Sequence, residues 1–172
     1  MQRSNRKTVT RVSALVLVLM LLFSLTASYA EASFAKSGAG VKYNGKTFKL
    51  GDTTTGAKLK KAFGSYTRKM DDGCTFGYAT YLYTFKSKGI TVETLQKKKG
   101  GSEQIITITI TKKTVPTIAG LKVGNANSAI KTKYGSKCTL SGSTARYKAG
   151  KYYMYVYTKS KKITKIVFYH DL

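Results

Sequence analysis

Alternating apolar and polar residues give the clearest structural signal in the chain. Ile106, Ile108 and Ile110 alternate with threonines at the odd positions between and after them. A period of two places the two sets on opposite faces of a strand, so one face is expected to be buried and the other solvated. Apolar-rich or alternating patterns predict further strands at 76–86, 90–95, 144–148, 152–158 and 162–169. A leading hairpin is predicted at 41–50, where Asn44-Gly45 is typical of a two-residue turn.

Two short segments show the spacing of an amphipathic helix instead. In the first, Leu59, Ala62 and Phe63 fall on one helical face. In the second, apolar residues recur every four positions from Ala126 to Tyr134. Each helix is expected to have a polar N-cap and a stop glycine, namely Asp52 and Gly64 in the first, Asn125 and Gly135 in the second.

The segments around these helices resemble each other. LGDTTTGAKLKKAFG (50–64) resembles VGNANSAIKTKYG (123–135), and YTFKSKGIT (83–91) resembles YVYTKSKKIT (155–164). The offset between matching landmarks is nearly constant: 73 for Gly51 and Gly124, 71 for Gly64 and Gly135, and 72 for Tyr83 and Tyr155. A constant offset of about 72 residues indicates a tandem duplication.

The duplication predicts two units and a fold class. Unit one, with the leading hairpin, is expected at 41–113, and unit two at 114–172. In each unit a short helix precedes about three antiparallel strands. We therefore expect an α+β tandem repeat with its helices packed on one sheet face.

The first 30 residues have the layout of a secretory signal peptide. Positions 1–11 carry four basic residues and no acid, and 12–25 are almost wholly apolar. This run of 14 residues is shorter than the roughly 20 needed to span a bilayer, so an uncleaved anchor is the second interpretation.

Small residues at the end of this segment fit a cleavage site. We expect cleavage after Ala30, with Ala32 as the second choice, which assigns 1–30 to the signal peptide. Residues 31–40 are small and polar and are expected to form a flexible tail. The mature protein is predicted to be secreted, and extracellular or associated with the cell wall.

Positive charge dominates the composition, with 31 Lys and Arg residues against 7 Asp and Glu and a net charge of +24. Cleavage after Ala30 removes four basic residues and no acid, which leaves +20. Such a charge attracts polyanions in a salt-dependent way. Lysines in predicted turns and at strand ends are the candidate polyanion-binding residues: Lys97, Lys98, Lys99, Lys159, Lys161, Lys162 and Lys165.

The identity of the polyanion follows from compartment and chemistry. Lys outnumbers Arg 26 to 5, and the point charge of Lys favours diffuse attraction over recognition of particular bases. For an exported protein we expect an anionic cell-wall polymer or membrane surface, and no nucleic acid. The alternative is a solubilising surface in which lysines protect exposed strand edges.

Composition leaves little room for a catalytic or metal site. One His and two Cys are too few for an ordinary zinc site, which takes three or four N or S ligands. A glycosidase would need two carboxylates about 5–10 Å apart across a cleft. The candidates for such a pair are Asp52, Asp71, Asp72, Glu93 and Glu103. No convincing pair is evident in the sequence, so we expect a protein without cofactor or catalytic residues.

The two cysteines, Cys74 and Cys138, occupy roughly equivalent places in the two units. Two cysteines in an exported protein suggest one disulfide. The alternative is two buried free thiols, because equivalent places in two repeats need not be neighbours in space.

Tyrosines gather on one predicted strand, which contains Tyr152, Tyr153, Tyr155 and Tyr157. The last three alternate onto one face of that strand. They are candidates for an aromatic platform that binds sugar rings or a partner protein. The alternative is that the rings form the floor under the helices. The sheet needs large residues beneath its helices, which favours this alternative.

Several motifs resemble those of known families: YNGKTFKL, LKKAFG, GCTF and AGLKVGNANSAIKTKYG. Over 41–169 the chain resembles an uncharacterised family of secreted proteins and lipoproteins from clostridia-like Gram-positive bacteria. Each half resembles the small lipoproteins of the outer-membrane assembly machinery, and the tandem resembles β-lactamase inhibitory protein. The resemblance implies binding to other proteins and no catalysis. The chain lacks the lipid-accepting Cys that many relatives have.

These observations predict a secreted, non-catalytic binding module that its positive charge attracts to an anionic cell-envelope polymer. The alternative is an inhibitor-like module that binds a partner protein through the sheet face or a hairpin loop. The oligomeric state does not follow from the sequence.

Overall fold

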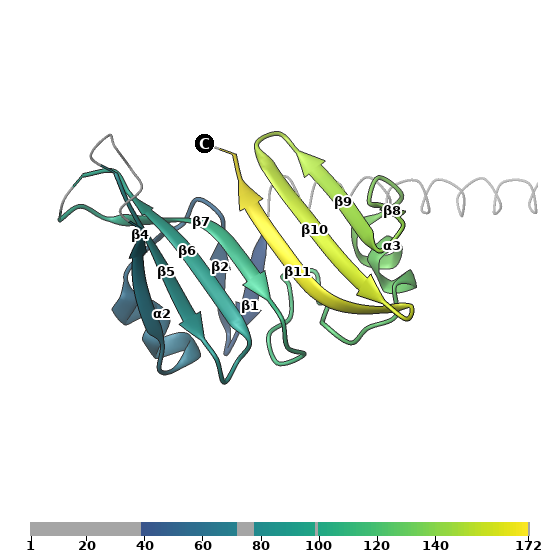
Figure 1. Cartoon of the computed structure of the whole chain (residues 1–172), viewed down its shortest axis with the longest axis horizontal. Coiled ribbons are helices and arrows are strands. Elements are labelled where there is room, and N and C mark those ends of the chain that lie inside the picture. Colours follow the sequence, from purple (N-terminus) through teal and green to yellow (C-terminus); the bar gives the residue numbers. More distant parts are fainter. Residues whose placement is uncertain (1–38, 72–77, 99, 172) are drawn as a thin grey trace, which may run out of the picture.

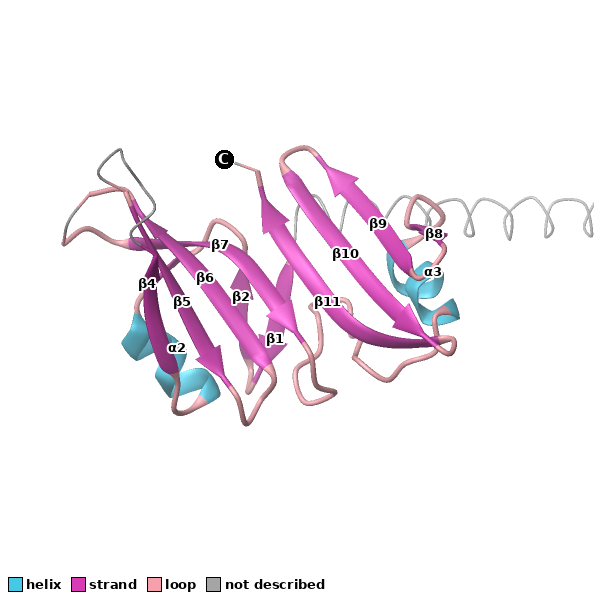
Figure 2. Ribbon diagram, viewed as in Figure 1, coloured by secondary structure: helices cyan, strands magenta, loops and turns pink. Residues whose placement is uncertain are grey.

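The computed structural model describes residues 39–71, 78–98 and 100–171, and the predicted signal peptide lies outside them. Antiparallel strands dominate this part of the chain, with 51% of it in strands and 12% in helices (Figure 2). None of its helices is long and apolar enough to cross a membrane.

The described residues form eleven strands and two helices. In chain order they are β1 (Gly40–Tyr43), β2 (Lys46–Lys49), β3 (Thr53–Thr54), α2 (Gly56–Phe63), β4 (Thr67–Asp71), β5 (Ala79–Phe85), β6 (Ile90–Gln96), β7 (Glu103–Ile110), α3 (Ser128–Tyr134), β8 (Thr139–Ser141), β9 (Thr144–Ala149), β10 (Tyr152–Lys159) and β11 (Lys162–His170).

Nine strands join into one antiparallel sheet, in the order β4-β5-β6-β7-β11-β10-β9-β8, with β3 paired to β7 off this path (Figure 1). The pairing of β7 with β11 connects the two halves of the chain. A separate hairpin of β1 and β2 turns at Asn44 and Gly45, whose φ angles are 48° and 73°. Glycine and Asn tolerate such positive angles, which explains the tight turn.

One hydrophobic core lies on a single face of the large sheet and extends across both halves. In Figure 1 the two helices lie behind opposite ends of the sheet, and the β1–β2 hairpin lies behind its centre. The helices bury only five side chains, namely Leu59, Ala62, Phe63, Ile130 and Tyr134. Val41 and Phe48 of the hairpin and Val115 and Leu121 of the β7–α3 connection supply further buried cover.

The expected α+β tandem repeat with helices packed on one sheet face is therefore wrong. The protein is a β-rich fold in which strand pairing organises the molecule. Helices of eight and seven residues are too short to form a layer over nine strands. The hairpin and a connecting segment complete the cover that the sequence pattern assigned to helices alone.

The expected N-caps are also wrong. The α2 helix begins after Thr55, whose hydroxyl accepts a hydrogen bond from Lys58 N at 3.2 Å. Asp52 Oδ2 instead accepts one from Lys49 N at 2.8 Å. In the second half, the side chain of Asn125 likewise accepts a hydrogen bond from the backbone three residues earlier. Both side chains close turns that precede the helices, a common role of Asp and Asn.

Candidate functional site

Strand β10 presents its tyrosines on the sheet face that is turned away from the core. Met154 and Val156 are fully buried on the core side. Tyr153, Tyr155 and Tyr157 alternate with them and are half-buried on the other side. We call this second side of the sheet the open face.

Strand register places basic residues beside these tyrosines. On the β9 side, Tyr153 is opposite Lys148, and Tyr155 is opposite Arg146. On the β11 side, the partners of Tyr153, Tyr155 and Tyr157 are Tyr169, Val167 and Lys165. Directly opposed residues on one sheet face have side chains in reach of each other. The register thus assembles an aromatic–basic patch, comprising Arg146, Lys148, Tyr153, Tyr155, Tyr157, Lys165 and Tyr169.

The rings and cations of this patch are in direct contact. The Tyr153 and Tyr155 rings are nearly parallel, with centroids 6.3 Å apart and 7° between their planes. Arg146 Cζ lies 5.2 Å from the Tyr153 centroid and 5.9 Å from the Tyr155 centroid. Lys165 Nζ lies 4.0 Å from the Tyr157 centroid. These distances are within the range of cation–π attraction, which holds the charges over the ring faces.

The patch combines two binding chemistries on an open surface. Arg146 and Lys148 are exposed and offer donors and positive charge to an anion. Tyr169 is 41% exposed, and the other tyrosines keep part of each ring accessible. Aromatic rings provide flat apolar area that a sugar or another ring can cover. The patch can therefore hold an extended ligand that alternates rings with negative charges.

The tyrosines predicted as a platform separate into two groups. Tyr153, Tyr155 and Tyr157 lie on the open face, so they are not the floor under the helices. Tyr152 lies on the core side of β10, where its ring stacks on His170 with centroids 4.7 Å apart. The floor interpretation suits the other aromatic strand, in which Tyr83 and Phe85 are buried.

The structure disperses the lysines predicted to bind polyanions. Lys97 and Lys98 follow β6, whereas Lys159, Lys161 and Lys162 surround the β10–β11 turn at the opposite end of the sheet. Lys99 lies outside the described residues. Lys165 is the one member of the predicted set that belongs to the patch.

Arg146 and Lys148 are members of the patch that the sequence reasoning missed. Their signal was present in β9, where they alternate with the buried Ala145 and Tyr147. That alternation shows that both basic residues share one solvated face. Their approach to the tyrosines depends on the β9–β10 register, which the alternation does not reveal.

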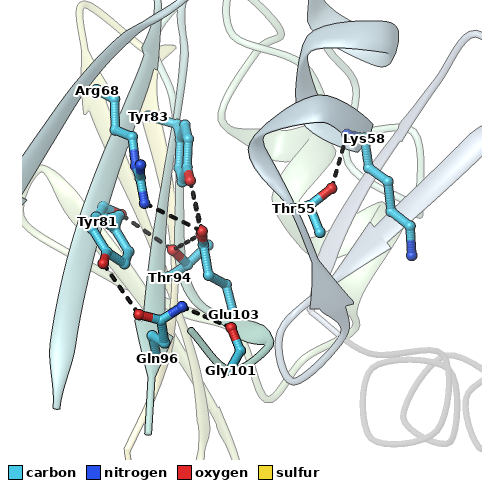
Figure 3. Close-up of polar contacts among 9 residues, drawn as sticks. All are labelled: Thr55, Lys58, Arg68, Tyr81, Tyr83, Thr94, Gln96, Gly101 and Glu103. Carbon is cyan, nitrogen blue, oxygen red and sulfur yellow. Dashed lines mark hydrogen bonds and ion pairs between the residues drawn. The ribbon is translucent and has the colours of Figure 1, made fainter. Parts of the chain in front are cut away.

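A second polar cluster surrounds Glu103 on the core side of the sheet. Figure 3 shows Arg68, Tyr83 and Thr94 converging on its carboxylate. Tyr83 donates at 2.9 Å, Thr94 donates at 2.7 Å, and Arg68 lies at 3.5 Å. The Arg68 guanidinium also lies 3.7 Å from the ring centroid of Tyr81.

This cluster has the properties of a structural network. Glu103 is only 8% exposed, and hydrogen bonds satisfy its carboxylate. Burial, and then the hydrogen bond to Glu103, raise the pKa of Tyr83 well above its usual range, so the hydroxyl remains a donor. The Arg68 side chain is 43% exposed, and solvent partly screens its ion pair with Glu103. Glu103 therefore stabilises the fold mainly as the acceptor for the Tyr83 and Thr94 hydroxyls.

Replacing Glu103 with leucine is expected to lower the free energy of unfolding by about 2–3 kcal/mol, because it leaves the buried Tyr83 and Thr94 hydroxyls without their acceptor. Glu103→Gln keeps an acceptor and is expected to cost about half as much. Urea denaturation followed by circular dichroism measures both values. Equal losses in the two variants would contradict the role of Glu103 as the acceptor for the Tyr83 and Thr94 hydroxyls.

The three acidic candidates whose side chains are described, Asp52, Glu93 and Glu103, have different surroundings. Glu103 lies on the core side, whereas Glu93 pairs with Thr107 on the open face. Asp52 Oδ2 accepts a hydrogen bond from Lys49 N, and the side chain of Asp71 and all of Asp72 lie outside the described residues. In the described ranges no three His, Cys, Asp or Glu side chains form a group that could hold a metal ion.

Cys138 is buried beneath the second half of the sheet. Burial raises the pKa of its thiol to about 11, so the thiol stays protonated near neutral pH. Cys74 lies outside the described residues, and its disulfide with Cys138 remains a prediction.

No protein family, curated protein or solved structure matches this chain. The resemblances noted from its motifs remain expectations. The function is therefore argued from the patch and its chemistry.

Proposed function

We propose that the protein is a non-catalytic binding module that holds an anionic cell-envelope polymer across its open face. The observation that carries this proposal is the contact of Arg146, Lys148 and Lys165 with tyrosine rings on adjacent strands. The cations supply attraction to phosphate or carboxylate groups, and the rings supply area for the sugar or linker between those groups.

The shape of the site favours a polymer over a small molecule. Small ligands usually bind in concave pockets that cover most of their surface. The patch instead extends along β10 and across to β9 and β11, with side chains at successive open-face positions. An extended chain can contact several of these positions at once, which adds many weak interactions.

The choice of an envelope polymer rests on the predicted signal peptide and on the net charge. An exported protein meets anionic wall polymers and acidic glycans before it meets nucleic acid. A charge of +20 on the mature chain raises the local concentration of such polymers, and salt screens this attraction.

Co-sedimentation with isolated cell walls tests the proposal. We expect retention at ~50 mM salt, loss of retention by ~500 mM, and little retention on walls stripped of their anionic polymer. Retention by stripped walls, or equal binding to RNA and wall polymer, would contradict recognition of an envelope polymer.

A tyrosine variant tests the contribution of the rings. Tyr155→Thr introduces a β-branched residue, which suits a strand, and removes the central ring of the patch. We expect several-fold weaker retention at ~50 mM salt with an unchanged salt dependence, because the ring carries no charge. The matched control is Leu140→Thr, which removes an exposed apolar side chain from the edge strand β8, outside the patch. Equal retention by Tyr155→Thr and the unmodified protein would exclude a role for the ring.

A protein partner is the second candidate, and exposed apolar side chains on the same face favour it. Leu82 is 39% exposed, Tyr78 is 43% exposed, and both lie on the open-face side of β5 and the segment before it. Aromatic and apolar residues are typical of the centres of protein interfaces. Binding at fixed stoichiometry that survives ~500 mM salt would support this candidate over the polymer.

A further inference from the structure

The large sheet branches at β7, and a pocket lies at the branch. Residues Thr107–Ile110 of β7 pair with β11, whereas Glu103 and Gln104 pair with β3. The end of β11 near His170 therefore has no direct strand partner at the start of β7. A cavity of about 660 Å³ occupies this place, and we call it the branch pocket.

The branch pocket has an apolar floor and a cationic rim. Leu95 of β6 and Ile106 of β7 form the floor, and each is 7% exposed. Lys97 follows the end of β6 and Lys151 lies in the β9–β10 turn, so two segments distant in the sequence each contribute a lysine to one pocket. His170 of β11 lines the pocket beside them.

The imidazole of His170 is held by stacking and not by a hydrogen bond at Nδ1. Its ring lies on Tyr152 with 24° between the two planes. The Nδ1 atom is buried and has no hydrogen-bond partner among the described residues. A buried polar atom without a partner is uncommon in folded proteins, and binding of a ligand beside it is one explanation.

The charges around His170 are mostly positive. Burial lowers its pKa, the nearby Lys151 and Lys97 lower it further, and Asp171 opposes them. A second hollow also includes His170, together with Tyr147, Lys148, Lys151 and Tyr152. The free protein thus holds a neutral imidazole between cations, and an anion bound there would relieve their repulsion.

We propose that the branch pocket binds an oxyanion, a carboxylate or a phosphate, with Lys97 and Lys151 holding the charge and Leu95 and Ile106 contacting the attached carbon skeleton. Leu95 and Gln104 line the pocket and alternate with the core-side Thr94 and Glu103, so part of the lining belongs to the open face. The pocket therefore extends the proposed function by anchoring one charged unit of the polymer. The inference rests on the proposed function only where it names the polymer as the ligand. Binding of a small anionic probe to the pocket can be tested separately.

Protonation of His170 is expected to strengthen this binding. A bound oxyanion favours the charged imidazolium, so binding raises the His170 pKa, and by linkage the affinity increases as the pH falls through that range. His170 is the single histidine of the chain, and its imidazole resonances can be followed without overlap from another histidine.

Nuclear magnetic resonance titration of His170 tests the proposal with sn-glycerol 3-phosphate and D-glucuronate as the two probes. Glycerol and glucose are their uncharged controls. We expect either anionic probe to raise the His170 pKa by about half a unit or more. If only one probe does so, that result identifies phosphate or carboxylate as the group that binds. No change with either probe at saturating concentration would overturn the proposal.

Paired variants separate a specific pocket from general charge attraction. Lys97→Gln with Lys151→Gln is expected to weaken probe binding at least tenfold, about 1.4 kcal/mol. Lys58→Gln with Lys61→Gln removes the same charge from exposed positions of α2 and is expected to leave binding unchanged. Equal weakening by both pairs would overturn the proposal.

Failure of this inference can be told from failure of the proposed function. A His170 response to the probes without retention on cell walls would contradict the proposed function and leave the pocket supported. Wall retention without a His170 response would overturn the pocket and leave the open-face patch supported.

Discussion

Replacing Phe63 with alanine is expected to lower the free energy of unfolding by about 3–5 kcal/mol, because it removes a large side chain from the centre of the core. Phe63 is fully buried at the end of α2. Its ring centroid lies 4.9 Å from that of Phe48, 5.3 Å from that of Phe85 and 5.7 Å from that of Tyr43. The substitution therefore loses contacts to the hairpin and to the large sheet together.

Urea denaturation followed by circular dichroism measures this loss. Leu140→Thr is the control, since Leu140 is 43% exposed on the edge strand β8 and its replacement is expected to change stability by about 0.5 kcal/mol or less. A loss below about 1 kcal/mol for Phe63→Ala would contradict the central place of this ring in the core.

Phe63 also illustrates why the predicted fold class is wrong although the local patterns are informative. The spacing of Leu59, Ala62 and Phe63 identified the buried face of α2 correctly. The pattern gives no measure of how much of the sheet a helix covers. Phe48 and Val41 of the hairpin cover another part of the sheet, and no local sequence pattern reveals that the hairpin and α2 join one core.

The strands show the same division between local and long-range information. The Ile–Thr alternation predicted β7, and Ile108 and Ile110 are fully buried as expected. Ile106 does not join them in the core, where Ile105 takes its place because the ladder with β6 is irregular at this point. The pairing of β7 with β11 joins residues about 60 positions apart, and alternation contains no information about that pairing. The short strands β3, β4 and β8 owe their conformation to their neighbours, because two to five residues carry too little pattern.

On β10 the alternation itself was ambiguous. Tyr153, Tyr155 and Tyr157 are large and partly apolar, and so are Met154 and Val156 between them. Either set could face the core, and the structure buries the second. Lysines are dense in the turns of the sequence, and this density predicts a polyanion site there. The patch instead takes its cations from three separate strand positions.

Removing the three cations of the patch is expected to abolish most retention on anionic cell walls. The variant combines Arg146→Gln, Lys148→Gln and Lys165→Gln. We expect at least tenfold weaker binding at ~50 mM salt and a shallower dependence on salt. The variant makes fewer charge contacts with the polyanion, so its binding releases fewer counterions. The three side chains lie over tyrosine rings, so a polymer that stacks on those rings also contacts these charges.

A second triple variant removes the same charge from the lysine-rich turn, by Lys159→Gln, Lys161→Gln and Lys162→Gln. Both variants lower the net charge by three, so long-range attraction falls equally, and any difference between them reports direct contact. Binding isotherms on isolated walls, taken across a salt series, measure both. We expect the turn variant to lose no more than about threefold in affinity. If the two variants weaken binding equally, total charge governs the interaction, and the open face is not the site that holds the polymer.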